Sequence, residues 1–385
     1  MRSGLLTALA TSLALAALPA AAWTPKSLDA IATGVMRETG ALGMAIAVID
    51  DGHVVATRAY GLRNAKGDPL TTDSVMYGAS LTKAAFAYTV LQLADEGVID
   101  LDRPIGEYLP RPLTDYGDAA IEDRYARWSD LAGDERWRKL TARILLSHRS
   151  GFANFGFLEP DGKLRFHFDP GARYAYSGDG LILLQFVLET GLGLDVGAEM
   201  QRRAFDRLGM TRTAMKWRPD FAGNLADGWT QEGKVEPHDE RSRVRAAGSM
   251  DTTIADMARL AAGVVRGEGL TPARRAEMTR GEAAITTASQ FPTLQPEAPA
   301  GRRVPGLAAG LGVVRFDGPQ GPGFFKGGHN DSTGNTWVCV EKRRRCVVVL
   351  ANDVRAEAGF ARIIRHVLGE TGVPFDWEYG RPSLP

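Results

Sequence analysis

The hydrophobic and polar positions near the N-terminus predict one helix followed by a β-hairpin. Residues 27–39 have the pattern of a helix, and two apolar runs, 44–49 and 54–60, lie on either side of the polar turn 50–52. Short apolar runs separated by a turn that contains Asp and Gly are typical of paired strands. We therefore expect the chain to enter its core with a helix and two antiparallel strands.

The C-terminal part has the pattern of further strands and a closing helix. The predicted elements here are the strands 311–316, 323–326, 336–340 and 347–350 and the helix 360–368. Pairing these strands with the N-terminal hairpin gives a mostly antiparallel sheet flanked by helices. The middle of the chain then remains as a largely helical insertion, in which 121–138 and 283–305 are expected to be irregular. The predicted fold class is α/β, of the α+β type.

The first 22 residues have the composition of a cleaved signal peptide. Arg2 precedes an apolar run over 5–18, and Ala20 to Ala22 come directly before Trp23. The apolar run is shorter than the roughly 20 residues that span a bilayer, so a permanent anchor is the less favoured reading. The residue directly after the expected cleavage site is not a cysteine. We expect a secreted protein without a stable membrane anchor, periplasmic if the source is Gram-negative.

Composition narrows the function further. The 385 residues include 46 Lys and Arg against 46 Asp and Glu, so no basic field is available for binding nucleic acid. The six histidines are dispersed, and neither Cys-x-x-Cys nor His-Glu-x-x-His occurs. We expect no metal site, no cofactor and no nucleic-acid partner. The expected partner is a small-molecule or peptide substrate, and the oligomeric state is left open.

Ser80 and Lys83 form a Ser-x-x-Lys motif at the head of an apolar segment that is predicted to be an amphipathic helix. A serine hydroxyl needs a base to act as a nucleophile, and residues three apart share a helix face. At a helix N-terminus, free N–H groups favour the oxyanion of acyl transfer. The alternative is that Ser80 is only a helix cap and Lys83 a solvated side chain, which is favoured unless partner motifs exist.

Two partner motifs do exist. Tyr176 lies on a loop that enters an apolar helix, where a nearby ammonium group would ease loss of its phenolic proton. A tyrosine that only packs its ring is the alternative. Lys326, Gly327, Gly328 and His329 end a short apolar strand, and paired glycines there allow a ligand to approach the backbone.

The order and spacing of these motifs resemble the serine β-lactamase and penicillin-binding protein superfamily, in its class C-like and esterase branch. The stretches 145–151 and 246–253 resemble that branch too. The resemblance implies one catalytic domain over 23–385, with an α/β part of about 23–84 and 301–385 and a helical part of about 85–300. The catalytic groups would meet between the two parts.

The resemblance also implies a role for each motif residue. Ser80 is the acylated nucleophile, Lys83 its base partner and Tyr176 a second general acid or base. Lys326 would attract a substrate carboxylate. The backbone N–H groups of Ser80 and His329 would form the oxyanion hole.

Two residues depart from the family pattern where it contacts substrate. Gly178 replaces the Asn that usually ends the second motif and binds the amide of a β-lactam side chain. Gly327 replaces the Thr or Ser whose hydroxyl usually binds the carboxylate. Each lost hydrogen bond to a charged group costs about 1.5 to 3 kcal/mol. These departures make an efficient β-lactamase less expected, whereas Lys326 favours a carboxylate-bearing substrate.

Cys339 and Cys346 flank a charged tip between two predicted strands. Symmetric pairing would place them opposite each other, so a disulfide in an oxidising compartment and two packed thiols are both open.

The sequence therefore predicts an exported serine hydrolase that forms an acyl-enzyme on Ser80. Its expected substrate is an amide or ester with a nearby carboxylate, such as a β-lactam or a D-amino-acid peptide. The alternatives are a carboxylesterase of the same family and a penicillin-binding sensor that acylates without turnover. A Ser-His-Asp triad is disfavoured because no Gly-x-Ser-x-Gly motif occurs.

Overall fold

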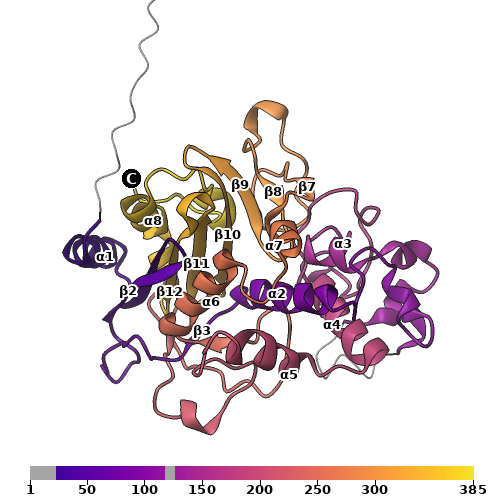
Figure 1. Cartoon of the computed structure of the whole chain (residues 1–385), viewed down its shortest axis with the longest axis horizontal. Helices are drawn as coiled ribbons and strands as arrows, with labels where there is room; N and C mark the ends of the chain where they lie inside the picture. Colours follow the sequence, from indigo (N-terminus) through magenta and orange to yellow (C-terminus); the bar gives the residue numbers. More distant parts are fainter. Residues whose placement is uncertain (1–22, 118–125) are drawn as a thin grey trace, which may run out of the picture.

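An eight-stranded antiparallel sheet forms one half of the molecule (Figure 1). The computed structural model describes residues 23–117 and 126–385, so the expected signal peptide and residues 121–125 of the first irregular stretch lie outside the described residues. The strand order is β2-β1-β12-β11-β10-β9-β8-β7. The strands are β1 (Gly43–Asp50), β2 (His53–Gly61), β7 (Ala283–Ala284), β8 (Ala308–Ala309), β9 (Val314–Gly318), β10 (Gly321–His329), β11 (Gly334–Val340) and β12 (Arg345–Ala351).

Strand β1 lies inside the sheet, between β2 and β12, and is buried on both faces. Ala45, Ala47 and Ile49 enter one hydrophobic core, whereas the alternate residues Met44, Ile46 and Val48 enter the other. This period of two explains why the segment is apolar without interruption, since both faces of the sheet are covered. The pairing of N-terminal with C-terminal strands confirms the predicted sheet.

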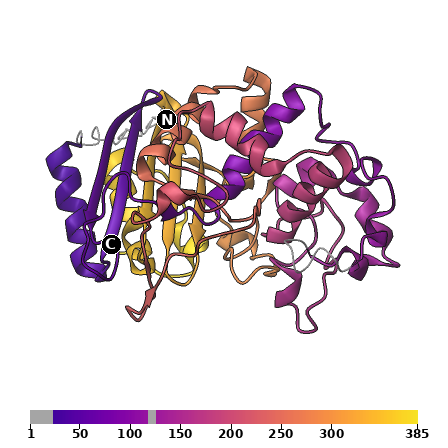
Figure 2. The same cartoon turned by 90° about the horizontal axis from the view of Figure 1, so that it is seen from below.

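Helices cover both faces of the sheet (Figures 1 and 2). On one face, α1 (Pro25–Thr39) packs against α8 (Phe360–Leu368), and α8 contacts β12. On the other face, α6 (Ile254–Arg266) contacts β1 and β12, while α2 (Leu81–Asp95) contacts β10 and β11. The ends of α1 and α8 agree with the predicted helices within two residues.

Helix α2 is buried along its whole length from Leu81 to Ala94, so the prediction of an amphipathic helix is wrong. Even Lys83 and Gln92 in this helix are at most 2% exposed. The reason is its position, since α2 lies between the sheet and the helical part and meets protein on every side (Figure 2). A helix that is enclosed in this way needs no polar face.

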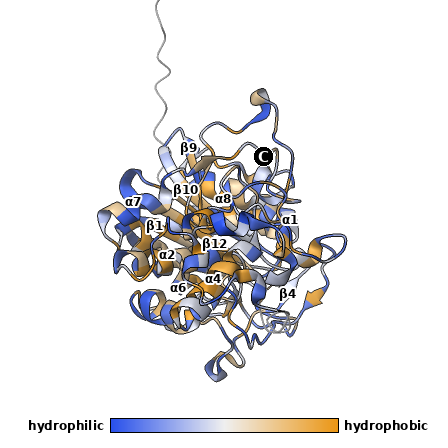
Figure 3. Cartoon of the chain, turned by 90° about the vertical axis from the view of Figure 1, so that its right-hand side faces the viewer, coloured by the Kyte–Doolittle hydropathy of each residue, from blue (hydrophilic) through white to orange (hydrophobic). Residues whose placement is uncertain are grey.

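The helical part lies beyond α2, and hydrophobic residues gather in the interior around α2 and α4 (Figures 2 and 3). It contains α3 (Ala142–Leu146), α4 (Gly178–Leu192) and α5 (Val196–Met200). Strand β7 belongs to the main sheet although it falls within the stretch 283–305 that we expected to be irregular. The sheet therefore draws residues from the end of the expected helical segment, where a strand of two residues leaves almost no pattern. Among the described residues, no single helix is long and apolar enough to span a bilayer. Helix α4 and the helical residues 196–206 together would be long and apolar enough, but the two segments meet at an angle of 106°.

The last helix, α9 (Phe375–Tyr379), returns to the sheet beside β10 and β11. The Trp377 ring meets Phe325 of β10 edge to face, and the Tyr379 hydroxyl donates a hydrogen bond of 2.6 Å to the carbonyl of Asn335 in β11. Helix α9 therefore packs directly behind the strand that carries Lys326.

Cys339 of β11 and Cys346 of β12 are opposite each other in the register and are joined by a disulfide. This pairing is one of the two readings that the sequence left open. The bond closes the hairpin at the end of the sheet remote from His329.

Candidate active site

The turn before α2 places Ser80 at the helix N-terminus, as the sequence predicts. Ala79 has a positive φ of 47°, which is uncommon for a residue with a side chain. Ser80 is the N-cap residue of α2, yet its side chain makes no capping hydrogen bond. The hydroxyl is therefore available for other partners, which argues against the reading of Ser80 as a simple cap.

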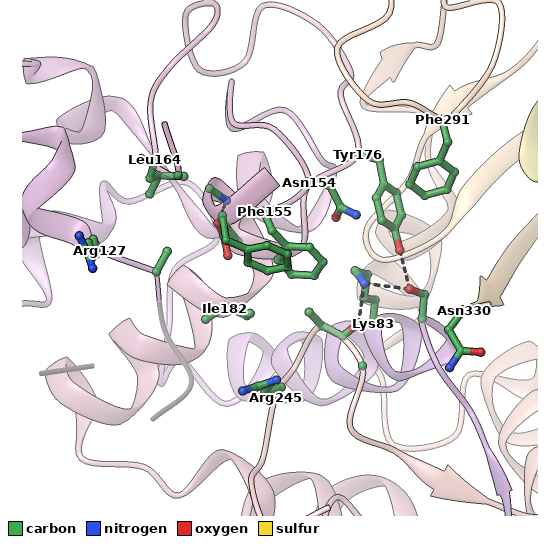
Figure 4. A pocket seen from close by; sticks show the side chains of 18 of the residues that line it. Lys83, Arg127, Asn154, Phe155, Leu164, Tyr176, Ile182, Arg245, Phe291 and Asn330 are labelled. Atoms are coloured by element: carbon green, nitrogen blue, oxygen red, sulfur yellow. Dashed lines mark hydrogen bonds between the residues drawn. The ribbon is translucent and has the colours of Figure 1, made fainter. Parts of the chain in front are cut away.

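The hydroxyl of Ser80 lies between Lys83 and Tyr176 (Figure 4). Lys83 Nζ is 3.0 Å from Ser80 Oγ, and the Tyr176 hydroxyl donates a hydrogen bond of 2.7 Å to the same oxygen. One group comes from the first turn of α2 and the other from the loop before α4. Both are within the distance at which a proton can pass to or from a serine nucleophile.

Lys83 is buried, with 1% of its surface exposed. Its ammonium nitrogen also donates a hydrogen bond of 2.5 Å to the carbonyl of Ala247. Burial, and then the positive charge of Lys326, lower the pKa of Lys83 well below its usual value. A lysine with a lowered pKa is a neutral amine at lower pH and can accept the proton of Ser80.

Tyr176 is held by aromatic neighbours on two sides. The ring of His148 stacks on it at 4.3 Å, and the ring of Phe291 meets it at 5.1 Å. Burial raises the pKa of Tyr176 far above its usual value, although the hydrogen bond to Ser80 opposes this. Our expectation that nearby ammonium groups make Tyr176 easier to deprotonate is therefore wrong, because the cost of burying a phenolate is larger. The phenol keeps its proton and can donate it.

Lys326 lies behind Tyr176 rather than on the wall of the cavity. It is 3% exposed, and its ammonium group donates to the carbonyl of Gly327 at 2.6 Å and to the Tyr176 hydroxyl at 3.5 Å. Burial lowers the pKa of Lys326 to about 8, while the charge of Glu378 opposes the shift. The ammonium group thus faces Tyr176, whereas we expected it to face a substrate carboxylate.

Gly328 brings strand β10 close to the turn at Ser80. A Cβ atom at this position would lie 3.0 Å from the backbone nitrogen atoms of both Ser80 and Leu81. A side chain there would fill the space in front of the Ser80 N–H, so only glycine keeps it open. This position suits an oxyanion hole made by the N–H groups of Ser80 and His329.

The side chains of the two histidines are engaged with other groups. His329 Nδ1 lies 3.0 Å from the Glu357 carboxylate, and His148 Nδ1 accepts a hydrogen bond of 3.1 Å from the N–H of Ser177. Within the described residues, neither ring is hydrogen-bonded to Ser80. The geometry therefore gives no support to a histidine as the base for Ser80.

Gly178 lies directly beneath an aromatic ring that the sequence analysis missed. A Cβ atom at Gly178 would lie 2.3 Å from the Phe155 ring. The N–H of Gly178 donates to the Asn154 side chain at 2.9 Å, which fixes the neighbouring loop. Phe155 therefore occupies the space that the family's Asn side chain would take. No pattern in the sequence linked residue 155 to residue 178, because the two meet only in the fold.

Gly327 has a similar relation to Glu378 of α9. A Cβ atom at Gly327 would lie 2.0 Å from Glu378 Oε1, so any other residue at position 327 requires that carboxylate to move. Glu378 is 4% exposed. The sequence analysis missed it too, since the residue stands in a short acidic and aromatic segment near the end of the chain without a motif.

The cavity in front of Ser80 has a volume of about 700 Å³. Phe155, Phe157, Leu164, Ile182 and Phe291 form its apolar walls, as Figure 4 shows for four of them. Arg127 and Arg245 lie on the wall away from the serine. The arrangement can acylate a serine with a substrate whose acyl group is apolar.

Two of the quoted sequence stretches contribute to this site. The stretch 145–151 contains His148, which supports Tyr176, and 246–253 contains Ala247, which accepts a hydrogen bond from Lys83. The resemblance therefore identified segments of the site whose roles only the fold makes plain.

Comparison with known proteins agrees with the resemblance. The family model described as Beta-lactamase matches residues 28–369. A lovastatin esterase of Penicillium rubens is 28% identical over 219 residues, which cover 49% of this chain and 53% of that protein. Esterase EstB of Burkholderia gladioli is 28% identical over 194 residues, which cover 48% of this chain and 49% of that protein. The chain spans about half the length of these relatives.

Solved structures share the fold at low identity. A D-alanine carboxypeptidase AmpC from Burkholderia cenocepacia superposes with a TM-score of 0.68 at 18% identity, covering 90% of this chain and 99% of the other. A class C beta-lactamase superposes with a TM-score of 0.69 at 16% identity, covering 89% and 95%. These likenesses confirm the predicted fold class. Because the family model matches most of the chain, the protein belongs to the Beta-lactamase family.

Proposed function

We propose that this protein is a carboxylesterase that forms an acyl-enzyme on Ser80 and acts on uncharged esters with an apolar acyl group. The observation that carries this proposal is the Phe155 ring, which fills the space beside Gly178 where the family binds the amide of a β-lactam side chain. An aromatic ring in that place favours an apolar group and offers no amide donor.

Acylation follows from the positions of the three polar groups. Lys83, as a neutral amine, takes the proton of Ser80 while Oγ attacks the ester carbonyl. The N–H groups of Ser80 and His329 stabilise the oxyanion that forms. Tyr176 keeps its proton because of burial, and it donates this proton to the leaving alkoxide as the carbon–oxygen bond breaks. Acylation thus leaves the serine proton on Lys83 and the Tyr176 oxygen without its proton, beside the ammonium groups of Lys83 and Lys326.

Deacylation reverses these roles. Water takes the place of the alcohol that has left, and the Tyr176 oxygen accepts its proton as it attacks the acyl carbon. The Ser80 oxygen then leaves with the proton held by Lys83, 3.0 Å away, which restores the free enzyme. No cofactor takes part in either step.

The known relatives give this proposal further support. Two of the curated proteins that the chain resembles are named as esterases, and each alignment covers about half of the chain. The structural neighbours are too distant in sequence to indicate a substrate.

A second candidate is the β-lactam or D-amino-acid peptide substrate that the sequence favours because Lys326 is retained. The retained lysine supports it, but its ammonium group points to Tyr176 and the Gly327 carbonyl. In this geometry Lys326 is better placed to act on Tyr176 than to bind a substrate carboxylate. We therefore place the ester ahead of the carboxylate-bearing amide.

The experiment is hydrolysis of p-nitrophenyl acetate, butanoate and octanoate by the mature protein beside a Ser80→Ala control. Multiple turnovers that need Ser80, with kcat/KM rising from acetate to butanoate, are the expected result. A single stoichiometric release without turnover would instead support the sensor reading. Release that the Ser80→Ala protein matches would overturn the proposal.

We also propose that the protein works outside the cytoplasm, after loss of residues 1–22. The disulfide between Cys339 and Cys346 supports this, since such bonds persist in oxidising compartments. Cell fractionation with N-terminal sequencing of the mature protein tests the proposal, and a protein that stays in the cytoplasm with Met1 intact would refute it.

A further inference from the structure

We propose that Glu378 is a positioning residue that balances the charge of Lys326 and thereby adapts the site to leaving groups without a carboxylate. This inference rests on the proposed ester hydrolysis and names its selectivity. Glu378 lies in residues 370–385, beyond the segment that the family model matches.

The space beside Gly327 shows that the two residues fit each other. Glu378 Oε1 occupies a point 2.0 Å from where a Cβ atom of residue 327 would be. A side chain at position 327 therefore overlaps the Glu378 carboxylate in its present place, and one of the two has to move. Because residue 327 on β10 is a glycine, the Glu378 carboxylate from α9 can occupy this space.

A hydrogen-bond network fixes the orientation of this carboxylate. The Tyr174 hydroxyl donates to Gln290 Oε1 at 2.6 Å, which turns the amide nitrogen of Gln290 the other way. Gln290 Nε2 then donates to Glu378 Oε2 at 2.8 Å. Because a hydroxyl can set the direction of the amide, the network presents a donor to the carboxylate. Burial raises the pKa of Glu378, whereas the charges of Lys326 and His329 and this hydrogen bond oppose the shift and favour the charged form.

The nearest positive charge on β10 is that of Lys326, the residue before Gly327. Lys326 Nζ donates to the Gly327 carbonyl, so its ammonium group and the Glu378 carboxylate meet the same residue of the strand. No direct ion pair joins them within 4 Å in the described part of the chain, so they act on each other through space. Glu378 opposes the effect of burial on the pKa of Lys326.

A second carboxylate lies at the next step of the strand. Glu357 Oε1 is 3.0 Å from His329 Nδ1, and its other oxygen is 3.4 Å from Arg381. Lys326, His329 and Arg381 therefore each have a carboxylate nearby. A substrate carboxylate placed along this strand meets a balanced set of charges and gains little attraction.

The position of the strand relative to the cavity shows which part of the substrate is affected. Phe155 lies on one side of Ser80 and Asn330, which follows His329, lies on the other (Figure 4). With the acyl group against Phe155, the leaving alcohol lies along the strand. The balanced charge behind Gly327 thus acts on the leaving group.

The test uses two butanoate esters that differ in one charge. One has 3-hydroxybenzoate as its leaving group, and the other has the methyl ester of 3-hydroxybenzoate. Both are assayed at pH 6.5, where Lys326 is charged. The full-length mature protein is expected to prefer the neutral ester, and Glu378→Gln is expected to raise kcat/KM for the carboxylate ester relative to the neutral one by about tenfold.

Asp256→Asn is the matched control, because Asp256 is another buried carboxylate, 1% exposed, that bonds Thr213 and Arg259 away from this strand. It is expected to leave the ratio of the two esters unchanged. An unchanged ratio in Glu378→Gln would overturn the inference. If neither ester is hydrolysed in a Ser80-dependent way, the proposed function fails instead.

A second test needs no activity. Gly327→Ser is expected to lower the melting temperature, because the new Cβ meets Glu378, and Glu378→Ala in the same protein is expected to restore most of the loss. Additive effects of the two substitutions on the melting temperature would show that position 327 and Glu378 do not share one space.

Discussion

The residues that contact the Ser80 hydroxyl keep the family pattern, whereas the residues at the positions where the family contacts substrate depart from it. Ser80, Lys83 and Tyr176 retain the family's residue types, and both Lys83 Nζ and the Tyr176 hydroxyl lie within 3.0 Å of Ser80 Oγ. Gly178 and Gly327 depart from the pattern, and the space beside each is filled by a residue from another segment. The residues that carry out the reaction and the residues that contact the substrate can therefore change independently on one fold.

A physical reason for this difference lies in what each group depends on. A proton transfer needs three groups at once, so replacing any one removes the reaction. The space beside a glycine needs only to be filled, and Phe155 and Glu378 fill it from elsewhere in the chain. The predictions below test each side of this comparison, beginning with the largest effect.

Replacing Lys83 by Ala is expected to lower kcat by about 10³-fold or more, because Ser80 then lacks a base. The measurement is steady-state hydrolysis of p-nitrophenyl butanoate. His329→Ala serves as the comparison, since only the backbone of His329 takes part. Intact activity in Lys83→Ala together with loss in His329→Ala would mean that the base is misassigned.

Replacing Tyr176 by Phe is expected to lower kcat for ethyl butanoate by about 10² to 10³-fold, because the leaving alkoxide loses its proton donor. Tyr88→Phe is the matched control, as Tyr88 is a buried tyrosine of α2 whose hydroxyl donates to the carbonyl of Glu268 and, in the described part of the chain, is not hydrogen-bonded to Ser80. Equal losses in the two variants, measured with the same ester, would point to packing and not to proton transfer.

Gly178→Asn restores the family's residue and is expected to destabilise the protein by about 1 to 3 kcal/mol, because the new side chain overlaps the Phe155 ring. Urea unfolding at pH 7 measures the change. Adding Phe155→Ala is expected to recover most of that stability. A Gly178→Asn protein as stable as the wild type would show that Phe155 does not hold this space firmly.

The activity is expected to fall as the pH rises through about 8, because burial lowers the pKa of Lys326 to that value. The ammonium form, present below this pH, makes the phenol of Tyr176 a better acid. Above this pH the charge is lost and kcat/KM for a neutral ester is expected to drop by about tenfold per pH unit. In Lys326→Met this decrease of kcat/KM at alkaline pH is expected to disappear. A decrease that remains in the variant would show that another group causes it.

The sheet could be predicted because its strands carry strong local patterns. Both strands of the N-terminal hairpin, the last two strands and the helix at 360–368 were found within two residues of their ends. Strands β7 and β8 were missed, since two residues carry no period. The amphipathic prediction for α2 failed because it assumed one solvent-facing side, whereas the tertiary structure encloses the helix.

The reacting groups were predictable for a different reason, since Ser80 and Lys83 share one helical turn and the other motifs resemble a known family. The residues that fill the space beside the two glycines were not predictable from the sequence. Phe155 meets Gly178, and Glu378 meets Gly327, only after the chain has folded, and no local pattern connects them. A glycine that departs from a motif was visible, but the residue that replaces its side chain in space was not.

The central claim is that the reaction is retained while the substrate contacts have changed. It is tested most directly by comparing kcat/KM for p-nitrophenyl butanoate and for a chromogenic cephalosporin, with Ser80→Ala as the control for both. The account predicts Ser80-dependent turnover of both or of the ester alone, with the ester favoured by about 100-fold or more, as expected from two lost hydrogen bonds. A cephalosporin turned over as efficiently as the ester would contradict it, and would show that Gly178 and Gly327 do not decide the substrate.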